Sequence, residues 1–211
     1  MPHFFIAGTD AGVGKTYVAC NLLRDLNNRG LTAGAFKPVC CGERADARRL
    51  REAAGMSESL EQINPIYLRA FAEPAMAAEL EHKAISMLQL VEAYESLRST
   101  YPILLVDAIS GWETPLADGI TMADLAEQLQ LPVILVVKNQ RGAVSQAIMS
   151  VRAISNRGLV CQAIVLNHIG EEWDTASVTN KQLIEHYTGV PVLAELIHDQ
   201  EYIDSQELLG I

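Results

Sequence analysis

The stretch FFIAGTDAGVGKT, residues 4–16, decides the fold of this chain. Its first part, residues 4–7, is apolar and long enough for a buried strand, and the chain then breaks at Gly8 into a glycine-rich turn. The turn ends in Gly14, Lys15 and Thr16, and residues 17–29 after it have the spacing of a helix. A glycine-rich turn between a strand and a helix is the context in which this pattern binds phosphate.

The residue types of the turn explain that chemistry. Glycines such as Gly12 and Gly14 let backbone N–H groups point toward an anion, and the following helix presents its positive end. Lys15 adds a mobile cation, and the Thr16 hydroxyl can reach a magnesium ion. The strict pattern has four residues between its outer glycines, whereas five separate Gly8 from Gly14. An ordinary turn with a surface lysine is the alternative, which the combined pattern makes less favoured.

Composition limits the class of protein. The chain has 211 residues, of which 49% are hydrophobic and 20% charged, so we expect one soluble globular domain over residues 1–211. A net charge of -10 argues against a general nucleic-acid or membrane surface, and a basic patch that would oppose it is missing from the sequence. Without a signal-type start or an apolar run of about 18 residues, we expect a cytoplasmic location. The four cysteines lack metal-ligand spacing.

Continuous apolar runs alternate with helical patterns along the chain. This order predicts an α/β, three-layer P-loop fold in a single domain, with a mainly parallel sheet flanked by helices. Residues 108–121 are expected to form a loop. The expected strands are residues 4–7, 31–38, 103–106, 132–137, 159–166 and 191–196, and the expected helices are 17–29, a short one within 43–55, 74–82, 86–100, 121–129, 143–157 and 175–188.

Polar residues follow several of these strands, where parallel sheets place their sites. Asp107 ends an apolar strand and is our candidate for a magnesium carboxylate beside Thr16, although a strand-end aspartate can instead cap the next turn. Lys37 ends another strand. Residues 43–55 carry Asp46 and four arginines, which we interpret as solvated charge in preference to a second phosphate clamp. These arginines are Arg44, Arg48, Arg49 and Arg51.

Several motifs together resemble the dethiobiotin synthetase family over nearly the whole chain, in order and spacing. They are the turn GTDxxVGKT at 8–16, Lys37-Pro38-Val39, Asn64-Pro65 with Glu73-Pro74, GWxTPL at 111–116 and LPVILV at 131–136. The resemblance implies a homodimeric enzyme that closes the ureido ring of dethiobiotin from 7,8-diaminononanoate, CO2 and Mg-ATP.

The resemblance also implies roles for individual residues. Lys15 and Lys37 would act in catalysis, and Asn167 matches the residue that reads adenine. The phosphates would lie on the turn, with ligands at Gly12, Val13, Gly14, Lys15, Thr16 and Tyr17. Thr16, Asp46 and Asp107 match magnesium positions, and the substrate side is formed by Cys41, Ser110 and Gly111.

The implied reaction needs no covalent enzyme intermediate. An amine of the substrate traps CO2 as a carbamate, ATP phosphorylates the carbamate to a mixed anhydride, and the second amine closes the ring. The protein then mainly positions reactants and neutralises charge. This agrees with a sequence that offers lysines and backbone amides but no evident Ser-His or Cys-His pair.

The chain departs from the family pattern on the substrate side. Residues 107–111 read DAISG where the family usually has EGAGG, and Cys41 stands in place of a serine. Ala11 replaces a threonine, Ser145 an asparagine, and a Pro-His pair is missing after Glu73-Pro74. Two explanations stay open: a working synthetase with a repacked pocket, or a relative with a changed substrate or no turnover.

A partition-type nucleotide-switch ATPase is the alternative from another class. Such proteins usually carry an extra lysine early in the phosphate loop, and residues 9–12 contain none. The end of the chain, residues 201–211, does not have the composition of a basic amphipathic membrane helix.

Overall fold

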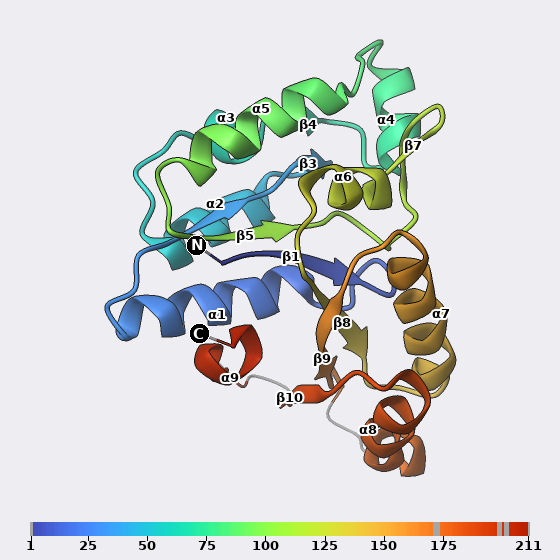
Figure 1. Ribbon diagram of the computed structural model, residues 1–211. Coiled ribbons are helices and arrows are strands. Elements are labelled where there is room, and N and C mark those ends of the chain that lie inside the picture. Colours follow the sequence, from blue (N-terminus) through green and yellow to red (C-terminus); the bar gives the residue numbers. More distant parts are fainter. Residues whose placement is uncertain (1, 171–173, 198–199, 201–202, 211) are drawn as a thin grey trace.

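A six-stranded parallel sheet forms the centre of the computed structural model, which describes residues 2–170, 174–197, 200 and 203–210 (Figure 1). The strand order is β10-β9-β8-β1-β5-β2, so β1 lies in the middle, between β5 and β8. Every residue of β1 is buried, as its apolar sequence predicts. The strands are β1 His3–Gly8, β2 Ala33–Phe36, β5 Ile103–Asp107, β8 Val133–Lys138, β9 Cys161–Asn167 and β10 Val192–Leu196.

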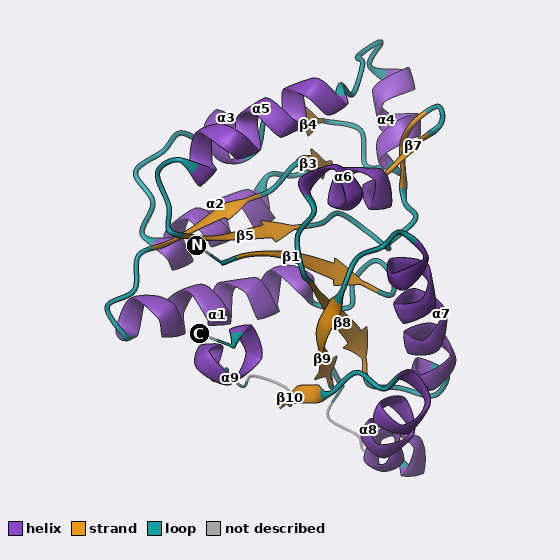
Figure 2. Cartoon of the chain, viewed as in Figure 1, coloured by secondary structure: helices purple, strands orange, loops and turns teal. Residues whose placement is uncertain are grey.

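Helices flank the sheet, which confirms the predicted three-layer arrangement (Figure 2). The helix α1 contacts β1, β2 and β5 and packs against α2 and α9, while α5 contacts α6, and α7 contacts α8. The helices are α1 Lys15–Asn28, α2 Ala45–Ala54, α3 Leu60–Ile63, α4 Pro74–Leu80, α5 Met87–Arg98, α6 Met122–Leu129, α7 Ala143–Asn156, α8 Thr175–Thr188 and α9 Ser205–Leu209. Thr121 caps α6 through a capping box with Asp124.

The strand register brings the carboxyl ends of the neighbouring strands β1, β5 and β2 together. Ile6 pairs with Asp107, and Phe36 pairs with Val106. Lys37, which follows Phe36, therefore lies next to Asp107 at the carboxyl edge of the sheet, beside the turn that leaves β1 at Gly8. This is the edge at which parallel sheets place their ligands.

Short elements were missed or misjudged from the sequence. The predicted strand 31–38 is only Ala33–Phe36, because the backbone N–H of Lys37 turns away to bond the Ile63 carbonyl and Pro38 has no N–H to donate. The expected loop 108–121 contains the hairpin β6 Pro115–Ala117 and β7 Ile120–Thr121. The strands β3 Val39–Cys41 and β4 Ile66–Leu68 form a further two-stranded parallel sheet.

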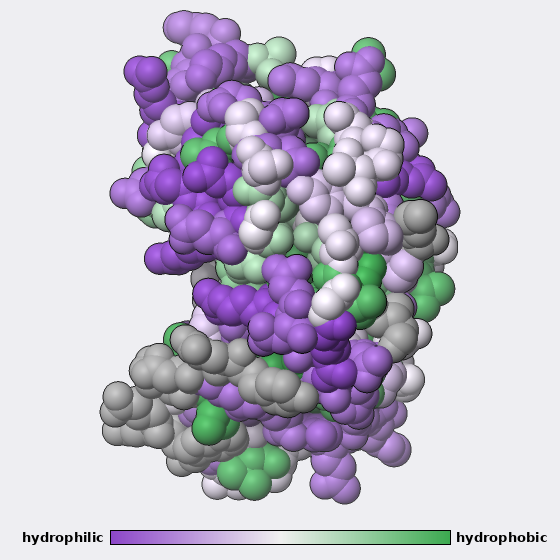
Figure 3. Space-filling view, turned by 90° about the vertical axis from the view of Figure 1, so that its left-hand side faces the viewer, coloured by the Kyte–Doolittle hydropathy of each residue, from purple (hydrophilic) through white to green (hydrophobic). Residues whose placement is uncertain are grey.

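The opposite end of the sheet presents a different surface. Figure 3 shows the face at the amino ends of β1 and β5, where hydrophilic side chains cover much of the surface and hydrophobic ones form small separate groups. Within the described part of the chain, the helices are too short or too polar to cross a membrane.

Candidate functional site

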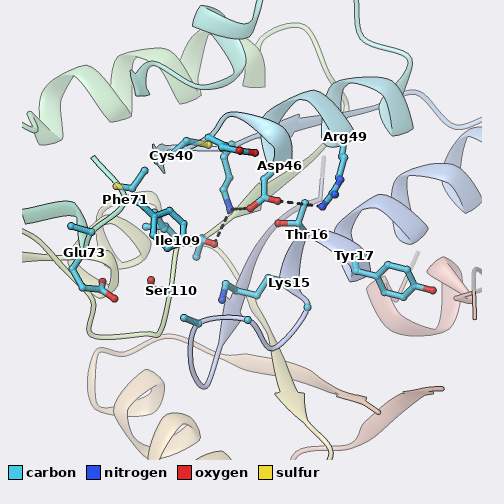
Figure 4. A pocket seen from close by; sticks show the side chains of 18 residues that line it. Lys15, Thr16, Tyr17, Cys40, Asp46, Arg49, Phe71, Glu73, Ile109 and Ser110 are labelled. Atoms are coloured by element: carbon cyan, nitrogen blue, oxygen red, sulfur yellow. Dashed lines mark hydrogen bonds and ion pairs between the residues drawn. The ribbon is translucent and has the colours of Figure 1, made fainter. Parts of the chain in front are cut away.

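An open cavity of about 560 Å³ lies at the carboxyl edge of the sheet. Its walls come from the turn after β1, the first turns of α1 and α2, and the loops after β3, β4 and β5. Figure 4 shows the residues of the phosphate turn and Asp46 toward one end, and Phe71, Ile109 and Ser110 toward the other. Of the predicted site residues, those that line it are Gly12, Gly14, Lys15, Thr16, Tyr17, Lys37, Cys41, Asp46 and Ser110.

Two positions of the turn require glycine, because neighbouring side chains come too close for a Cβ atom there. A Cβ atom on Gly8 would lie 2.8 Å from Val13 Cγ2 and 2.9 Å from the Lys15 ammonium, so glycine here leaves room for the lysine to fold back over the turn. Gly14 has φ 93°, and a Cβ there would lie 2.1 Å from Asn167 Nδ2. The five-residue gap therefore still gives a phosphate-loop geometry in which the backbone closes around Lys15.

Lys15 is 6% exposed, and its ammonium donates a hydrogen bond of 2.9 Å to the carbonyl of Asp10. Burial lowers the pKa of Lys15 to about 8, with a further lowering from Lys37 that the Asp107 carboxylate opposes. The lysine is thus poised to lose its charge slightly above neutral pH, and an anion brought into the turn would restore that charge.

Lys37 lines the cavity and forms a buried ion pair with Asp107 beneath it. Lys37 Nζ lies 2.9 Å from Asp107 Oδ2 and 3.6 Å from Asp46 Oδ2, and it also donates to the carbonyl of Ala108 at 3.2 Å. The Thr16 hydroxyl donates to the same Asp107 oxygen at 2.6 Å. Burial alone would lower the pKa of Lys37, but the two carboxylates outweigh burial and raise it, so the lysine stays charged.

The same cluster fits a magnesium ion. Among the described residues the buried Asp107 Oδ1 has no hydrogen-bond partner, while the other oxygen of this carboxylate accepts from Thr16. Mg²⁺ prefers such oxygen ligands and is usually held by one or two carboxylates together with substrate phosphates. No group of three or more His, Cys, Asp or Glu side chains in the described chain could hold a metal without such help.

The other end of the cavity is more apolar. Cys41, which is half-buried, lies there, and burial raises the pKa of its thiol to about 11, so the thiol stays protonated. Ile109 and Ser110 project their side chains where the family pattern has Ala and Gly. Ser110 has φ 50°, in the left-handed region that favours glycine.

Four predicted residues do not line this cavity. Asp107 lies fully buried beneath it, and Gly111 lines a neighbouring hollow with Thr9 and Trp112. Asn167 is 4% exposed and donates from Nδ2 to the Val13 carbonyl at 2.9 Å, so it supports the phosphate turn from behind. The Val13 side chain is buried below the turn.

Tyr17 does line the cavity, and its hydroxyl donates to the carbonyl of Gln200. Asn21, one helical turn further along α1, donates to the same carbonyl at 3.3 Å. The start of α1 is thereby tied to the segment after β10.

A polar network that sequence reasoning missed fixes the Lys37 backbone. Asn64 is fully buried and donates to the carbonyls of Lys37 and Ile66 at 2.9 and 3.0 Å. Arg44 bonds the Asn64 side chain at 3.0 Å and stacks on Tyr67. The interpretation of Arg44 as solvated charge is therefore wrong, because its guanidinium is held between Asn64, Glu61 and an aromatic ring. The sequence shows Asn64-Pro65 as a motif, but it does not show that Asn64 bonds the Lys37 carbonyl.

Comparison with known proteins identifies the family. A curated ATP-dependent dethiobiotin synthetase BioD from Akkermansia muciniphila is 42% identical over 99% of this chain and 98% of the relative. The chain belongs to the dethiobiotin synthetase family. A relative of the same name from Anaeromyxobacter dehalogenans is 40% identical over 100% of this chain and 96% of its own length. A family model described as an AAA domain matches residues 3–205.

Solved structures show how widely the fold is shared beyond dethiobiotin synthetases. A MinC:MinD cell division protein complex from Aquifex aeolicus matches with a TM-score of 0.62, and covers 98% of this chain and 86% of that chain. A ParA family ATPase from Chlorobium tepidum matches with a TM-score of 0.59, over 99% and 90%. Each is 13% identical, so these matches establish the fold alone. The family predicted from the sequence motifs is confirmed by the sequence matches to dethiobiotin synthetases described above.

Proposed function

We propose that this protein is an ATP-dependent dethiobiotin synthetase, which closes the ureido ring of dethiobiotin from 7,8-diaminononanoate, CO2 and Mg-ATP. The observation that carries the proposal is the placement of Lys15 and Lys37 on one cavity, between the phosphate turn and the loop after β5. Full-length relatives that bear this name support it.

The phosphate turn would hold the nucleotide. Backbone N–H groups of residues 12–17, at the start of α1, suit the phosphates, and Lys15 would leave the Asp10 carbonyl to meet them. Asn167 remains our prediction for the adenine contact. Its position behind Val13 would link base recognition to the shape of the turn, since one amide side chain would serve both.

Thr16, Asp46 and Asp107 would hold magnesium, which when bound supplies positive charge to the β- and γ-phosphates. Lys37 lies between both carboxylates, within reach of the cavity, so its ammonium can stabilise charge on a carbamate and on the phosphoryl group during transfer. The fixed partners of Lys37 mean that this cation is already in place before substrates arrive.

The second end of the cavity would receive the diamine. Ile109 offers an apolar surface for its hydrocarbon chain, and Cys41, Ser110 and Gly111 stand near the reacting end. An amine that has captured CO2 would present its carbamate oxygen to ATP, and the second amine would then displace phosphate. The residues present position these groups without themselves forming a covalent bond.

Turnover of two lysine variants tests the proposal. We expect Lys15→Gln and Lys37→Ala each to lower dethiobiotin formation by about a hundredfold or more, because each removes a charge that acts on the transferring phosphoryl group. Lys181→Ala, which removes an exposed lysine paired with Glu195 at 3.1 Å, is the matched control. Product is measured by mass spectrometry with diamine, bicarbonate and Mg-ATP, and circular dichroism checks folding. Near-normal product formation by either site variant would refute the assignment.

We also propose that residues 1–211 act as one domain and that two copies form a homodimer, as the family resemblance implies. Light scattering during gel filtration should then give a mass of twice 23.0 kDa. A mass of one chain at assay concentration would exclude the dimer but leave the chemistry of the cavity intact.

A further inference from the structure

Arg49 lies on the cavity side of α2. It follows Asp46 by three residues, so both side chains leave the same face of the helix. Both line the cavity, together with Lys15, Thr16 and Tyr17. Figure 4 shows the guanidinium of Arg49 reaching from α2 toward Thr16, across from the phosphate turn.

The guanidinium is held weakly in this position. Its Nη1 lies 3.9 Å from Asp46 Oδ1, and the side chains of Arg49 and Asp46 are 70% and 43% exposed. An exposed pair at such a distance contributes little, because water screens it and two side chains must be ordered. Arg49 is therefore free to turn to a more strongly charged partner that enters the cavity.

The other arginines of this segment have different surroundings. Arg44 is committed to Asn64 and Tyr67, as described above. Arg48, one position before Arg49, is exposed and is absent from the lining of the cavity. Of the four arginines interpreted as solvated charge, Arg49 alone lines the cavity, which is where a second phosphate clamp would have to be.

The charge balance of the cavity favours an anion at Arg49. The Lys37 ammonium lies 2.9 Å from Asp107 and 3.6 Å from Asp46, so these carboxylates balance much of its charge. An arginine guanidinium carries a positive charge and can donate two parallel hydrogen bonds to a phosphate. The net charge of the chain is -10, so a local cation matters more for holding a nucleotide polyphosphate here.

We propose that Arg49 is a phosphate ligand of the bound nucleotide, closing over it from α2 while the turn holds it from β1. This inference rests on the proposed nucleotide site and adds a residue to it. On binding, the guanidinium would exchange its long contact with Asp46 for a phosphate oxygen, and Asp46 would be released toward the metal. The contact would hold α2 against the nucleotide.

Calorimetric titration of the full chain with ADP, AMP and adenosine tests this assignment. We expect Arg49→Ala to weaken ADP binding about tenfold, which corresponds to about 1.4 kcal/mol. Arg49→Lys should recover part of the loss, because a lysine keeps the charge without the fork. Arg48→Ala, the neighbouring exposed arginine, should bind ADP as the wild type does. AMP shows which phosphate Arg49 contacts. If Arg49→Ala also weakens AMP binding, the contact is to the α-phosphate; if AMP binding is unchanged, the contact is to the β-phosphate.

Two results would overturn the inference. The first is that Arg49→Ala binds ADP within about twofold of the wild type. The second is that Arg49→Ala loses as much affinity for adenosine as for ADP, which would mean that Arg49 contacts the base or supports the fold instead of a phosphate. If the wild type binds ADP and forms dethiobiotin while Arg49→Ala is unchanged, only this inference fails. If the wild type binds no nucleotide, the proposed function fails with it.

Discussion

Ser110→Gly should stabilise this protein, because Ser110 is held at φ 50° in the loop after β5. A side chain in the left-handed region costs about 1–2 kcal/mol, and glycine avoids this cost. The greater freedom of glycine in the unfolded chain takes back about 0.4–1 kcal/mol. Within the described chain the Ser110 hydroxyl bonds no other residue, so no hydrogen bond is lost. The net expectation is a gain of about 1 kcal/mol in the free energy of unfolding, from these two magnitudes.

Urea denaturation measures this gain, and a thermal melt should show a rise of about 2–4 °C for a chain of this size. Ser110→Ala is the first control, since alanine keeps the backbone cost and should leave stability within about 0.5 kcal/mol. Gln130→Gly is the second, because Gln130 has φ 52° at the end of α6, away from the cavity. It should also stabilise the protein without altering the KM for the diamine. If Ser110→Gly is no more stable than Ser110→Ala, the argument from backbone strain is wrong.

Four further predictions concern charge and substrate fit. The pKa of Lys15 is lowered to about 8 from 10.5, so its charge destabilises the folded state below pH 8. In urea titrations the free energy of unfolding should therefore rise between about pH 8 and pH 10.5 in the wild type, but not in Lys15→Met. For the same reason ADP binding at pH 8.5 should take up a proton, seen as a buffer-dependent heat; a buffer-independent heat would contradict it. We expect Lys37→Met and Asp107→Asn each to lower the free energy of unfolding by about 3 kcal/mol, because each leaves a buried charge without its partner. The double variant should lose much less than the sum, and strictly additive losses would refute the coupling. Ile109→Ala should raise the KM for the diamine about fivefold, because about 1 kcal/mol of apolar contact is lost, and should leave the KM for ATP unchanged. An unchanged or lower KM for the diamine would show that Ile109 does not contact the hydrocarbon chain of the diamine.

The central architecture could be predicted because its signals are periodic and long. Continuous apolar runs such as β1 and β8 are buried on both faces, so each reads as a strand without knowledge of its partners. The meeting of Lys15, Lys37 and Asp107 followed from one rule, that carboxyl ends of parallel strands share an edge. Three-residue strands such as β3 and β4 carry too few residues for any period to be seen.

The network around Asn64 could not be predicted for a different reason. Its bonds join a side chain to the carbonyls of Lys37 and Ile66, and such bonds leave no periodic mark in the sequence. The placement of Arg49 depended on which face of α2 meets the cavity, which is set by packing against α1. The sequence placed Asn167 correctly at a strand end, but its hydrogen bond to the phosphate turn is seen only in the structure.

Oxygen transfer from labelled bicarbonate tests the central claim most directly. If ATP phosphorylates a carbamate in this cavity and ring closure expels phosphate, one oxygen of the carbamate must leave with that phosphate. With ¹⁸O-labelled bicarbonate, Mg-ATP and 7,8-diaminononanoate, under conditions faster than exchange with water, the account predicts one ¹⁸O atom in each phosphate released together with dethiobiotin. Unlabelled phosphate, or phosphate released without the ring product, would contradict it.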